Sequence, residues 1–400
     1  MTEKKRTHME TLKEFSIPLI AGVVIAILWA NLAPTSYHSV EHTLHFAVND
    51  IFMVFFFALA TVEITESCLP GGALNPPRKA LNPIFGTLGG VLGPVGVYLL
   101  WTYLSGDSTI ANGWGIPTAT DIALAWLVAR MVFGAKHPAV SFLLLLAVAD
   151  DGIGLGIIAI FYPDPAHPVQ PSHLWGVVFA MSMTYAMRKA GAKAVWFYLI
   201  SGAACWVALY KAGIHPALAL VPIVPFMPHS DHDEGLFASS ELDSATHTDT
   251  LSHFKQALEF PVCIGLFFFG LVNAGVQVSG IGNATWAVMI SLIVGKTVGI
   301  TLFSLVAHRI FGFSLPDGLE PKLLPLVGLV AALGLTVALF VAGVAFTDPV
   351  LAGAAKMGAL LSVVAAPIAI VIGYILRQKR KKRVLLSGCH ILKRPRKINK

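Results

Sequence analysis

The chain has 400 residues, of which only 12% are charged and 56% are hydrophobic, and its mean hydropathy is +0.72. About a quarter of the residues of a typical soluble protein are charged, so this composition excludes soluble domains and predicts a polytopic membrane protein. The net charge of +6 does not indicate nucleic-acid binding, because 11 of the 28 Lys and Arg residues lie between Arg377 and Lys400.

Twelve apolar runs follow one another along the chain. A straight membrane-spanning helix needs about 20 apolar residues, so most of the runs are long enough, while the fourth, sixth and eighth are short. The runs are residues 15–32, 48–64, 81–104, 114–129, 138–162, 174–187, 194–210, 215–225, 260–278, 286–307, 323–346 and 350–376. The sequence therefore predicts an all-α membrane protein with about twelve transmembrane helices.

The basic residues predict how these runs cross the membrane. Outside the C-terminal segment, 14 Lys and Arg residues fall on one side of the runs, and only Lys211 and Lys356 fall on the other. Cytoplasmic loops carry the excess of Lys and Arg, so both termini are predicted to be cytoplasmic. We divide the chain into a cytoplasmic N-terminus (residues 1–14), a membrane domain (15–376) and a basic cytoplasmic tail (377–400) that should bind anionic lipid headgroups.

Four ionisable residues lie deep within the runs, where a charge is costly and usually functional. Asp150 and Asp151 stand in the middle of the fifth run, so at about 1.5 Å per helical residue both fall near the midplane of the membrane. Lys296 stands halfway along the tenth run, and Asp121 lies near the middle of the fourth. Three acids and one lysine at matching depth, on three helices, form one candidate site.

The sequence around Asp121 predicts an interrupted helix. Pro117 removes a backbone donor and disturbs the preceding turn, and Thr118 and Thr120 add hydroxyl groups beside the carboxylate. Hard cations bind oxygen ligands of this kind, and a broken helix at this depth must be buried or line a cavity. The alternative is that Asp121 only caps a helix at the break. A second break is conceivable between Gly328 and Thr336, where small residues for close helix packing are an equal explanation.

Neighbouring helical residues point about 100° apart, so Asp150 and Asp151 cannot share one partner in the same way. One of them can pair with Lys296 while the other faces a cation pathway. Adjacent carboxylates in a medium of low dielectric constant titrate as a coupled pair, as a carrier that exchanges protons for a cation requires. The competing interpretation is a buried salt bridge that only fixes helix packing, but Asp151 has no second internal lysine to neutralise it.

Two further features lie on the predicted cytoplasmic side. Glu63 and Glu66 end the second run and are expected to be solvated, although Glu63 could contribute to an entrance funnel. The loop 228–259 contains seven acids and four histidines, and histidine charge changes make pH sensing conceivable. A solvated acidic loop is the simpler interpretation. Glu63 and His253 are therefore only candidates for a pH response.

Several motifs together point to one family. They are Gly115-Ile-Pro-Thr-Ala-Thr-Asp121, Ala149-Asp150-Asp151, Asn273-Ala-Gly275 and Gly295-Lys296-Thr-Val-Gly299, accompanied by Asn49-Asp50 and Glu63. In this combination and order they resemble the NhaA family of bacterial sodium/proton antiporters, over residues 15–376. The resemblance implies twelve helices with an inverted-topology repeat, in which the fourth and eleventh are interrupted and cross near the midplane, an architecture for which this family is a standard example.

The resemblance also implies roles for individual residues. Asp151 would be the main ligand of Na⁺ or Li⁺ in an exchange site that it forms with Asp150, with Thr120 as an additional candidate ligand, and Asp150 would pair with Lys296 in the ion-free state. Asp121 would compensate the dipoles at the crossed helix ends. Lys296 and Asp151 would each carry a proton, which makes the exchange electrogenic. No cofactor is implied, because sodium ions and protons are the substrates, and the location implied is the bacterial inner membrane, where the protein would serve pH homeostasis.

Some positions depart from the family pattern. The family usually has basic residues directly after the position of Glu63, whereas Ile64-Thr65-Glu66 follow here, and residues 251–256 match its pH-responsive region poorly. Ion exchange is therefore better supported than pH regulation. A homodimer is expected from the family alone.

Two other functions fit parts of the sequence. A sodium-coupled symporter of an organic anion with a related fold would need a roomier cavity. An intramembrane aspartyl protease also uses two embedded acids, but the Gly-x-Gly-Asp sequence of that family is absent, and Lys296 would have no purpose. We therefore expect a secondary transporter and not an enzyme.

Overall fold

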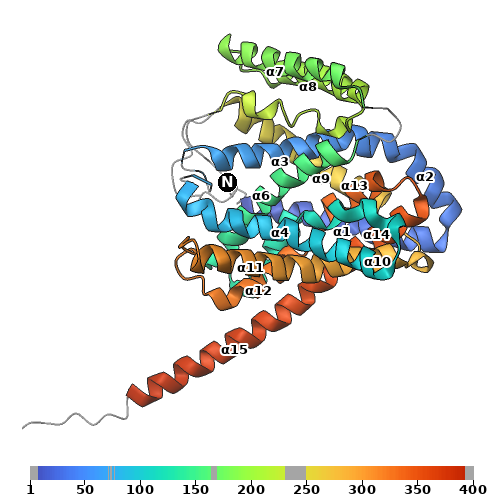
Figure 1. The fold of residues 1–400 in the computed structure, drawn as a ribbon. Helices are drawn as coiled ribbons and strands as arrows, with labels where there is room; N and C mark the ends of the chain where they lie inside the picture. The colour runs from blue at the N-terminus through green and yellow to red at the C-terminus, as the bar shows by residue number, and fades with distance from the viewer. Residues whose placement is uncertain are drawn as a thin grey trace, which may run out of the picture.

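The computed structural model describes residues 8–70, 72, 74–75, 77–163, 169–229 and 249–391. Within these ranges all regular secondary structure is helical (Figure 1), which confirms the predicted fold class. The α-helices are α1 (His8–Leu32), α2 (Pro34–Phe46), α3 (Met53–Cys68), α4 (Pro77–Ser105), α5 (Ile122–Phe133), α6 (Pro138–Phe161), α7 (Leu174–Lys189), α8 (Val195–Ala212), α9 (Thr250–Asn273), α10 (Asn283–Ile290), α11 (Lys296–Arg309), α12 (Leu324–Ala331), α13 (Thr336–Ala345), α14 (Pro349–Leu361) and α15 (Ala365–Ile391).

Shorter segments of tighter or wider helix join or interrupt these helices. The 3₁₀ segments are η2 (Ser108–Thr118), η3 (Pro171–His173), η4 (Pro216–Leu218), η5 (Val224–Phe226), η6 (Val278–Gly280), η8 (Pro321–Leu323) and η9 (Ser362–Val364), and the π segments are η1 (Ala47–Phe52) and η7 (Ser291–Gly295). The predicted loop residues 230–248, the N-terminal residues 1–7 and the tail residues 392–400 lie outside the described ranges.

Length and composition identify the membrane-crossing elements of the described chain. Seven helices are long and apolar enough to cross a membrane, and two bent pairs, η2–α5 and α12–α13 with its preceding η8, bring the number to nine. The apolar part of α1, residues 17–32, is shorter, α7 has 16 residues, and the eighth predicted run contains no regular α-helix. A multi-pass membrane protein is thus confirmed, while the count of twelve crossings stays a prediction.

The eighth predicted run, residues 215–225, is irregular. It contains only the 3₁₀ turns η4 and η5 and intervening turns, because Pro216, Pro222 and Pro225 remove three backbone donors. The Arg188 side chain lies 3.4 Å from that of His229, so the segment returns to the end of the bundle where α7 stops. Most of its side chains are buried, so the irregular backbone faces protein rather than lipid.

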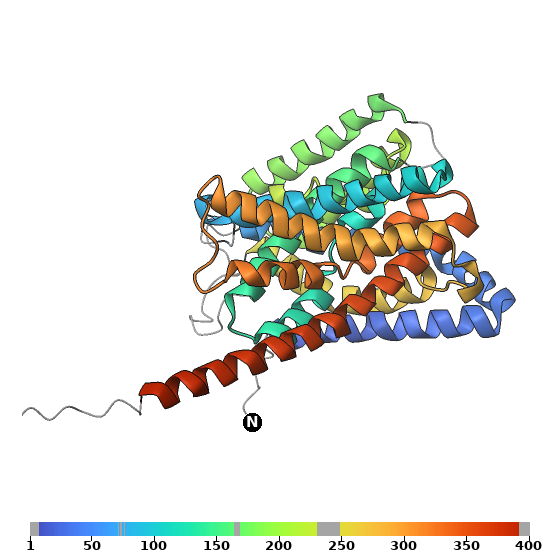
Figure 2. The same cartoon turned by 60° about the horizontal axis from the view of Figure 1, so that its bottom comes forward.

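Four helices extend well beyond the predicted runs, and among them α1 begins at His8 and α9 at Thr250. The helix of the second run begins at Pro34, because the polar α2 continues through the π segment η1 into α3 as one 35-residue helix. At the other end of the chain, α15 continues past Leu376 to Ile391 and projects from the bundle (Figures 1 and 2).

Glycines allow α4 and α11 to pack backbone against backbone, side by side in Figure 2. A Cβ atom at Gly93 would overlap the Gly295 carbonyl oxygen, and one at Gly299 would overlap the Gly89 carbonyl oxygen. Small residues at such crossings are the usual means of close helix association in membranes, where no hydrophobic force draws helices together. This crossing fixes the position of Lys296, which lies between the two glycines of α11 and η7.

We expect Gly93→Ala to lower the melting temperature of the purified protein, because overpacking a close contact costs about 1–3 kcal/mol. Gly96→Ala, one turn further along α4, is the matched control, since a Cβ there meets nothing within 4 Å. Its melting temperature should stay the same or rise, because Ala favours a helix over Gly. Equal melting temperatures for the two variants would contradict this account of the crossing.

Candidate ion-exchange site

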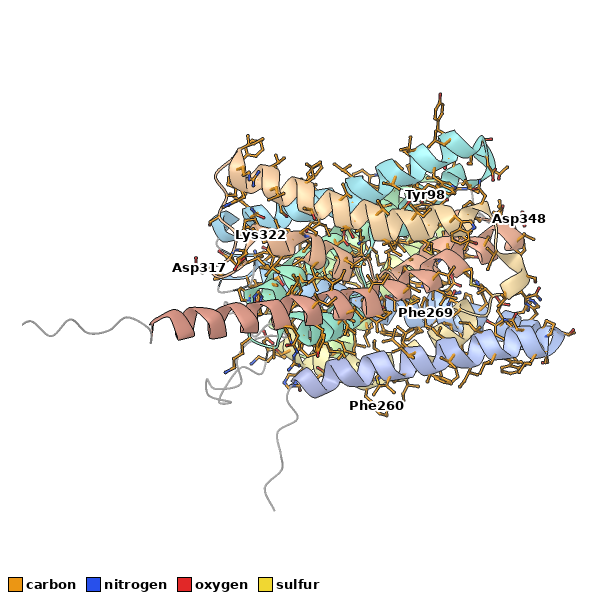
Figure 3. The ribbon with its side chains drawn as sticks, turned by 90° about the horizontal axis from the view of Figure 1, so that it is seen from below. Tyr98, Phe260, Phe269, Asp317, Lys322 and Asp348 are labelled. Atoms are coloured by element: carbon orange, nitrogen blue, oxygen red, sulfur yellow. The ribbon has the colours of Figure 1, made fainter. Side chains whose placement is uncertain are left out.

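Two broken helices cross in the middle of the bundle. The η2–α5 pair bends by 62° and the α12–α13 pair by 55°. Figure 3 shows Asp317 and Lys322 at one end of the bundle and Asp348 at the other, so the α12–α13 pair runs from end to end. Residues 119–121 and 332–335 separate the halves, and the Asp121 amide donates a 2.7 Å hydrogen bond to the Leu333 carbonyl. The segment around Gly334 is therefore a second break, and packing alone does not account for it.

Asp121 lies where two half-helices begin. Its Oδ1 atom accepts a hydrogen bond from the Leu124 amide at 3.1 Å, which caps the N-terminus of α5. Its carboxylate also lies near the Thr336 amide at the start of α13. The N-terminus of a helix carries about half a positive charge, so one carboxylate between two such ends is favourable. The cap interpretation of Asp121 and the dipole interpretation thus describe the same arrangement.

Thr120 and Lys296 lie at the opposite, carbonyl ends of the half-helices. The Thr120 hydroxyl is 3.0 Å from the Ala331 carbonyl at the end of α12 and 2.8 Å from Asp150 Oδ2, so its single proton can be donated to either. Its oxygen accepts a 2.6 Å hydrogen bond from Lys296 Nζ. A cation beside helix C-termini, which carry partial negative charge, is again favourable.

The adjacent acids of α6 face different surroundings. Asp150 is 0% exposed, and its Oδ2 atom lies 2.6 Å from Lys296 Nζ in a salt bridge that is fully buried on both sides. Asp151 is less buried and lines a cavity of about 110 Å³ together with Thr120, Asp121 and Thr336. In the described part of the chain, Asp150 Oδ1, Asp151 Oδ1 and Asp121 Oδ2 are buried oxygens without a hydrogen-bond partner.

Buried carboxylate oxygens without partners are costly unless a proton or a cation binds them. Within the described ranges, no group of three or more His, Cys, Asp and Glu side chains could hold a metal ion. A hard cation at Asp151 would thus complete its shell with hydroxyl, carbonyl or water oxygens. Such a shell suits an ion that binds and leaves, in contrast to a resident metal centre.

Lys296 follows the π segment η7, in which the regular hydrogen-bond ladder of the helix is widened. Short π segments are rare in proteins, and those that are found often lie at functional sites. The other one, η1, contains Asn49, whose side-chain oxygen accepts a 2.8 Å hydrogen bond from the Asn273 amide at the end of α9. Both motif residues are buried. The two widened turns thus coincide with two of the sequence motifs.

Two cavities lie near opposite ends of α9. The cavity of Asp151 is also lined by Lys255 and Glu259, in the first turns of that helix, whereas a cavity of about 710 Å³ is lined by Gly275 and Gly280, beyond its last residue. Twenty helical residues span about 30 Å, the thickness of the hydrocarbon core. The polar residues of the larger cavity are His38, Glu41, His42, His45, Gln277 and Lys356.

The sequence prediction for Glu63 and Glu66 was wrong, because both are buried rather than solvated. Their exposed fractions are 8% and 6%, and that of Lys255 on α9 is 7%. Lys255 Nζ lies 2.6 Å from Glu66 Oε2 and 3.2 Å from Glu63 Oε1. His253, in contrast, is exposed. Glu63, Glu66 and Lys255 thus form one ion-paired cluster between α3 and α9.

Lys255 and Thr336 were not predicted as site residues from the sequence. From the sequence, Lys255 was counted only among the basic residues of the cytoplasmic side. A single lysine in the first turns of an apolar helix needs a partner, and this could have indicated an ion pair with the acids of another helix. Thr336 closes the run Gly328–Thr336, and its hydroxyl is the polar group that this run brings to the cavity.

Comparisons with known proteins agree with this architecture. The sequence model of the family described as Na⁺/H⁺ antiporter 1 matches residues 6–376. The chain belongs to this family. It is 56% identical over 385 residues to a protein of Geobacter metallireducens named Na⁺/H⁺ antiporter NhaA, with 94% of this chain and 99% of that protein covered. A protein of the same name from Desulfitobacterium hafniense is 56% identical over 391 residues, with 96% and 99% covered. The predicted resemblance is confirmed.

A solved structure shares the fold of this family member. The sodium/proton antiporter MjNhaP1 of Methanocaldococcus jannaschii superposes with a TM-score of 0.52 at 15% sequence identity, covering 92% of this chain and 98% of that one. At this identity the likeness concerns the fold alone. The roles of Asp150, Asp151, Lys296, Asp121 and Thr120 in ion exchange stay predictions.

Proposed function

We propose that this Na⁺/H⁺ antiporter exchanges Na⁺, or Li⁺, for protons at Asp151. The observation that carries the proposal is the pair of environments on α6. Asp150 is neutralised by Lys296, whereas Asp151 keeps a buried oxygen without a hydrogen-bond partner and lines a cavity. The relatives in Geobacter metallireducens and Desulfitobacterium hafniense are named as Na⁺/H⁺ antiporters, which supports the same assignment.

Competition for the same oxygens couples the two ions. A protonated Asp151 offers no charge to Na⁺, whereas an ionised Asp151 in a medium of low dielectric constant requires a cation nearby. Binding of Na⁺ therefore drives a proton off, and protonation drives Na⁺ off. Thr120 and the carbonyls at the crossed helix ends supply further oxygens within reach of the site.

Entry of Na⁺ beside Asp150 weakens the salt bridge to Lys296, so the ammonium can release a proton and regain it when Na⁺ leaves. Asp151 and Lys296 would then carry two protons for one sodium ion. The exchange would move net charge, and membrane voltage would drive it as well as the proton gradient.

The crossed breaks and the two cavities support alternating access. Half-helices joined by extended residues can tilt against their neighbours, while the carboxylates stay near the middle of the bundle. We infer that the Asp151 cavity opens on the cytoplasmic side, an orientation that the excess of basic residues supports. We infer from the family that the protein works in the bacterial inner membrane, exports cytoplasmic sodium in pH homeostasis, and forms a homodimer with its basic tail against anionic lipids.

Proton flux in sealed vesicles tests this function. Protein-containing vesicles that hold an acidic interior should lose their pH gradient when Na⁺ or Li⁺ is added outside, and empty vesicles should not. An organic-anion symporter would instead need its anion before any flux appears. A gradient that responds to no alkali cation would refute the proposal.

Electrogenic exchange gives a second expected result. In proteoliposomes with a potassium diffusion potential set by valinomycin, a negative potential on the side to which protons move should accelerate sodium export. Reversing the potential should slow it. An exchange rate that is the same at both potentials would contradict the proposed ratio of more than one proton per sodium ion.

A further inference from the structure

The larger cavity, of about 710 Å³, takes no part in the proposed exchange. It lies beyond the last residue of α9, at the opposite end of that helix from Lys255, and is bounded by α2, by residues 275–280 and by α14 (Figure 1). The helix that begins with the polar α2 has 35 residues and is about 50 Å long, whereas the hydrocarbon core of a membrane is about 30 Å thick. The polar end therefore extends toward water, and the cavity lies within reach of solutes and lipid headgroups.

Nitrogen-containing side chains from two elements meet at this cavity. His38, His42 and His45 recur at helical spacing on α2, so one stripe of imidazoles faces the cavity, and all three residues line it. Lys356 lines it from α14. Both Glu41 and His45 are close enough to Lys356 for their charges to act on its ammonium group. Residues more than 300 positions apart in the chain thus converge on one hollow.

The charges of the cavity favour an anion. Lys356 is only partly exposed, and within the described ranges it forms neither a hydrogen bond nor an ion pair. Glu41 is the one carboxylate among the described lining residues, and its Oε2 atom lies 2.9 Å from His38 Nδ1. Histidines and a glutamate could suggest a metal ion, but no group of His, Cys, Asp and Glu in the described chain could hold one. One ammonium and three imidazoles therefore outweigh one carboxylate.

We propose that the larger cavity binds a tetrahedral oxyanion, such as inorganic sulfate or phosphate or the phosphodiester of a lipid headgroup. Lys356 supplies a charged donor, the imidazoles of α2 donate from both nitrogens when they are protonated, and the Gln277 amide adds a neutral donor. Hydrogen bonds from charged donors to such anions are about twice as strong as those between neutral groups. The bound anion would join α2 to α14. This site is separate from Asp151, so the proposal goes beyond ion exchange.

Equilibrium binding of ³⁵S-sulfate to the purified protein, at constant ionic strength, tests the site. Sulfate keeps its double charge between about pH 8 and about pH 6, whereas imidazoles gain protons over this range, so the affinity should rise about tenfold as the pH falls. Lys356→Gln should weaken binding about tenfold, because a charged donor is lost. Glu41→Gln should strengthen it, because the carboxylate that repels the anion is gone. Weaker binding in Glu41→Gln, as at a cation site, would overturn the proposal.

Lys322→Gln is the matched control, because it removes the same charge at the other end of the bundle. Figure 3 shows Lys322 far from Asp348, the residue that precedes α14. This variant should bind sulfate as the wild type does, and so should Asp151→Asn, in which the exchange site is lost. Equal weakening in Lys322→Gln and Lys356→Gln would indicate attraction by net charge alone and would contradict the proposed site. An affinity that does not change with pH would contradict it as well.

A second variant keeps the test decisive if Lys356→Gln does not fold. His42 and His45 are exposed residues of α2, and Gln is a better helix former than His, so His42→Gln with His45→Gln should fold. This double variant should lose most of the dependence of sulfate affinity on pH. A dependence equal to that of the wild type would show that these imidazoles do not bind the anion.

Competition at about pH 6 distinguishes the sources of the oxyanion. If short-chain phosphatidylglycerol displaces sulfate at lower concentrations than inorganic phosphate does, the site binds a lipid headgroup. If inorganic phosphate is the stronger competitor, the site binds a free anion. Displacement by neither compound would overturn the proposal.

Discussion

Asp151→Asn should abolish Na⁺-dependent proton flux while the protein still inserts and folds. An amide cannot bind and release a proton, and it replaces a charged ligand of Na⁺ with a neutral one. The loss of a charged hydrogen-bonding partner alone costs about 1.5–3 kcal/mol, which corresponds to a fall of up to about 100-fold in the rate at low sodium. Loss of the exchanged proton should bring the flux below detection.

The measurement is vesicle flux normalised to folded protein, with Asp348→Asn as the control. Asp348 caps α14 at the far end of the bundle, accepting a 2.9 Å hydrogen bond from the Val350 amide, and Asn is an equally good cap. This control should transport like the wild type. Flux near the wild-type level in Asp151→Asn would show that another group exchanges the ions.

Lys296→Met should lower the free energy of unfolding by more than Gly93→Ala does. The substitution leaves the carboxyl group of Asp150 0% exposed and without its 2.6 Å partner, and breaking a buried pair on one side costs about 3–5 kcal/mol. Thermal unfolding in detergent, followed by tryptophan fluorescence, should show a clear drop in the melting temperature. Surviving protein should exchange ions without a response to membrane voltage.

The double variant Lys296→Met with Asp150→Asn tests whether the unpaired carboxyl group of Asp150 causes the loss of stability. Removing both charges removes the uncompensated carboxylate, so most of the lost stability should return, since replacing both partners of a buried pair is often nearly neutral. If the double variant melts as early as Lys296→Met, the loss comes from packing along α11. The salt bridge would then not be what holds these helices together.

The sequence was sufficient to single out the candidate ion-exchange residues, because charged residues are rare inside membrane-spanning segments. A charge in the middle of an apolar run needs a partner or a function, so Asp150, Asp151 and Lys296 stood out without any structure. The helical offset of about 100° between neighbours was enough to assign the two acids of α6 different surroundings.

Other features depend on tertiary contacts that composition does not encode. From the sequence, a helix break at Gly334 could not be distinguished from a run of small residues for close helix packing, because Gly and Ala are found in both. Glu66 was predicted to be solvated because it lies near the end of a helix. Its burial is explained only by Lys255, which approaches it from α9. The 3₁₀ form of residues 215–225 followed from three prolines that were visible in the sequence but not used.

The proposed exchange requires that Na⁺ and a proton compete for Asp151. Isothermal titration of the purified protein with Na⁺ in buffers of different ionisation enthalpy measures the protons released per ion bound. Competition predicts proton release and, at acidic pH, an apparent Kd for Na⁺ that rises about tenfold per unit fall in pH for each proton displaced. Asp151→Asn should show neither effect. Binding of Na⁺ without proton release, at an affinity that does not change with pH, would contradict it.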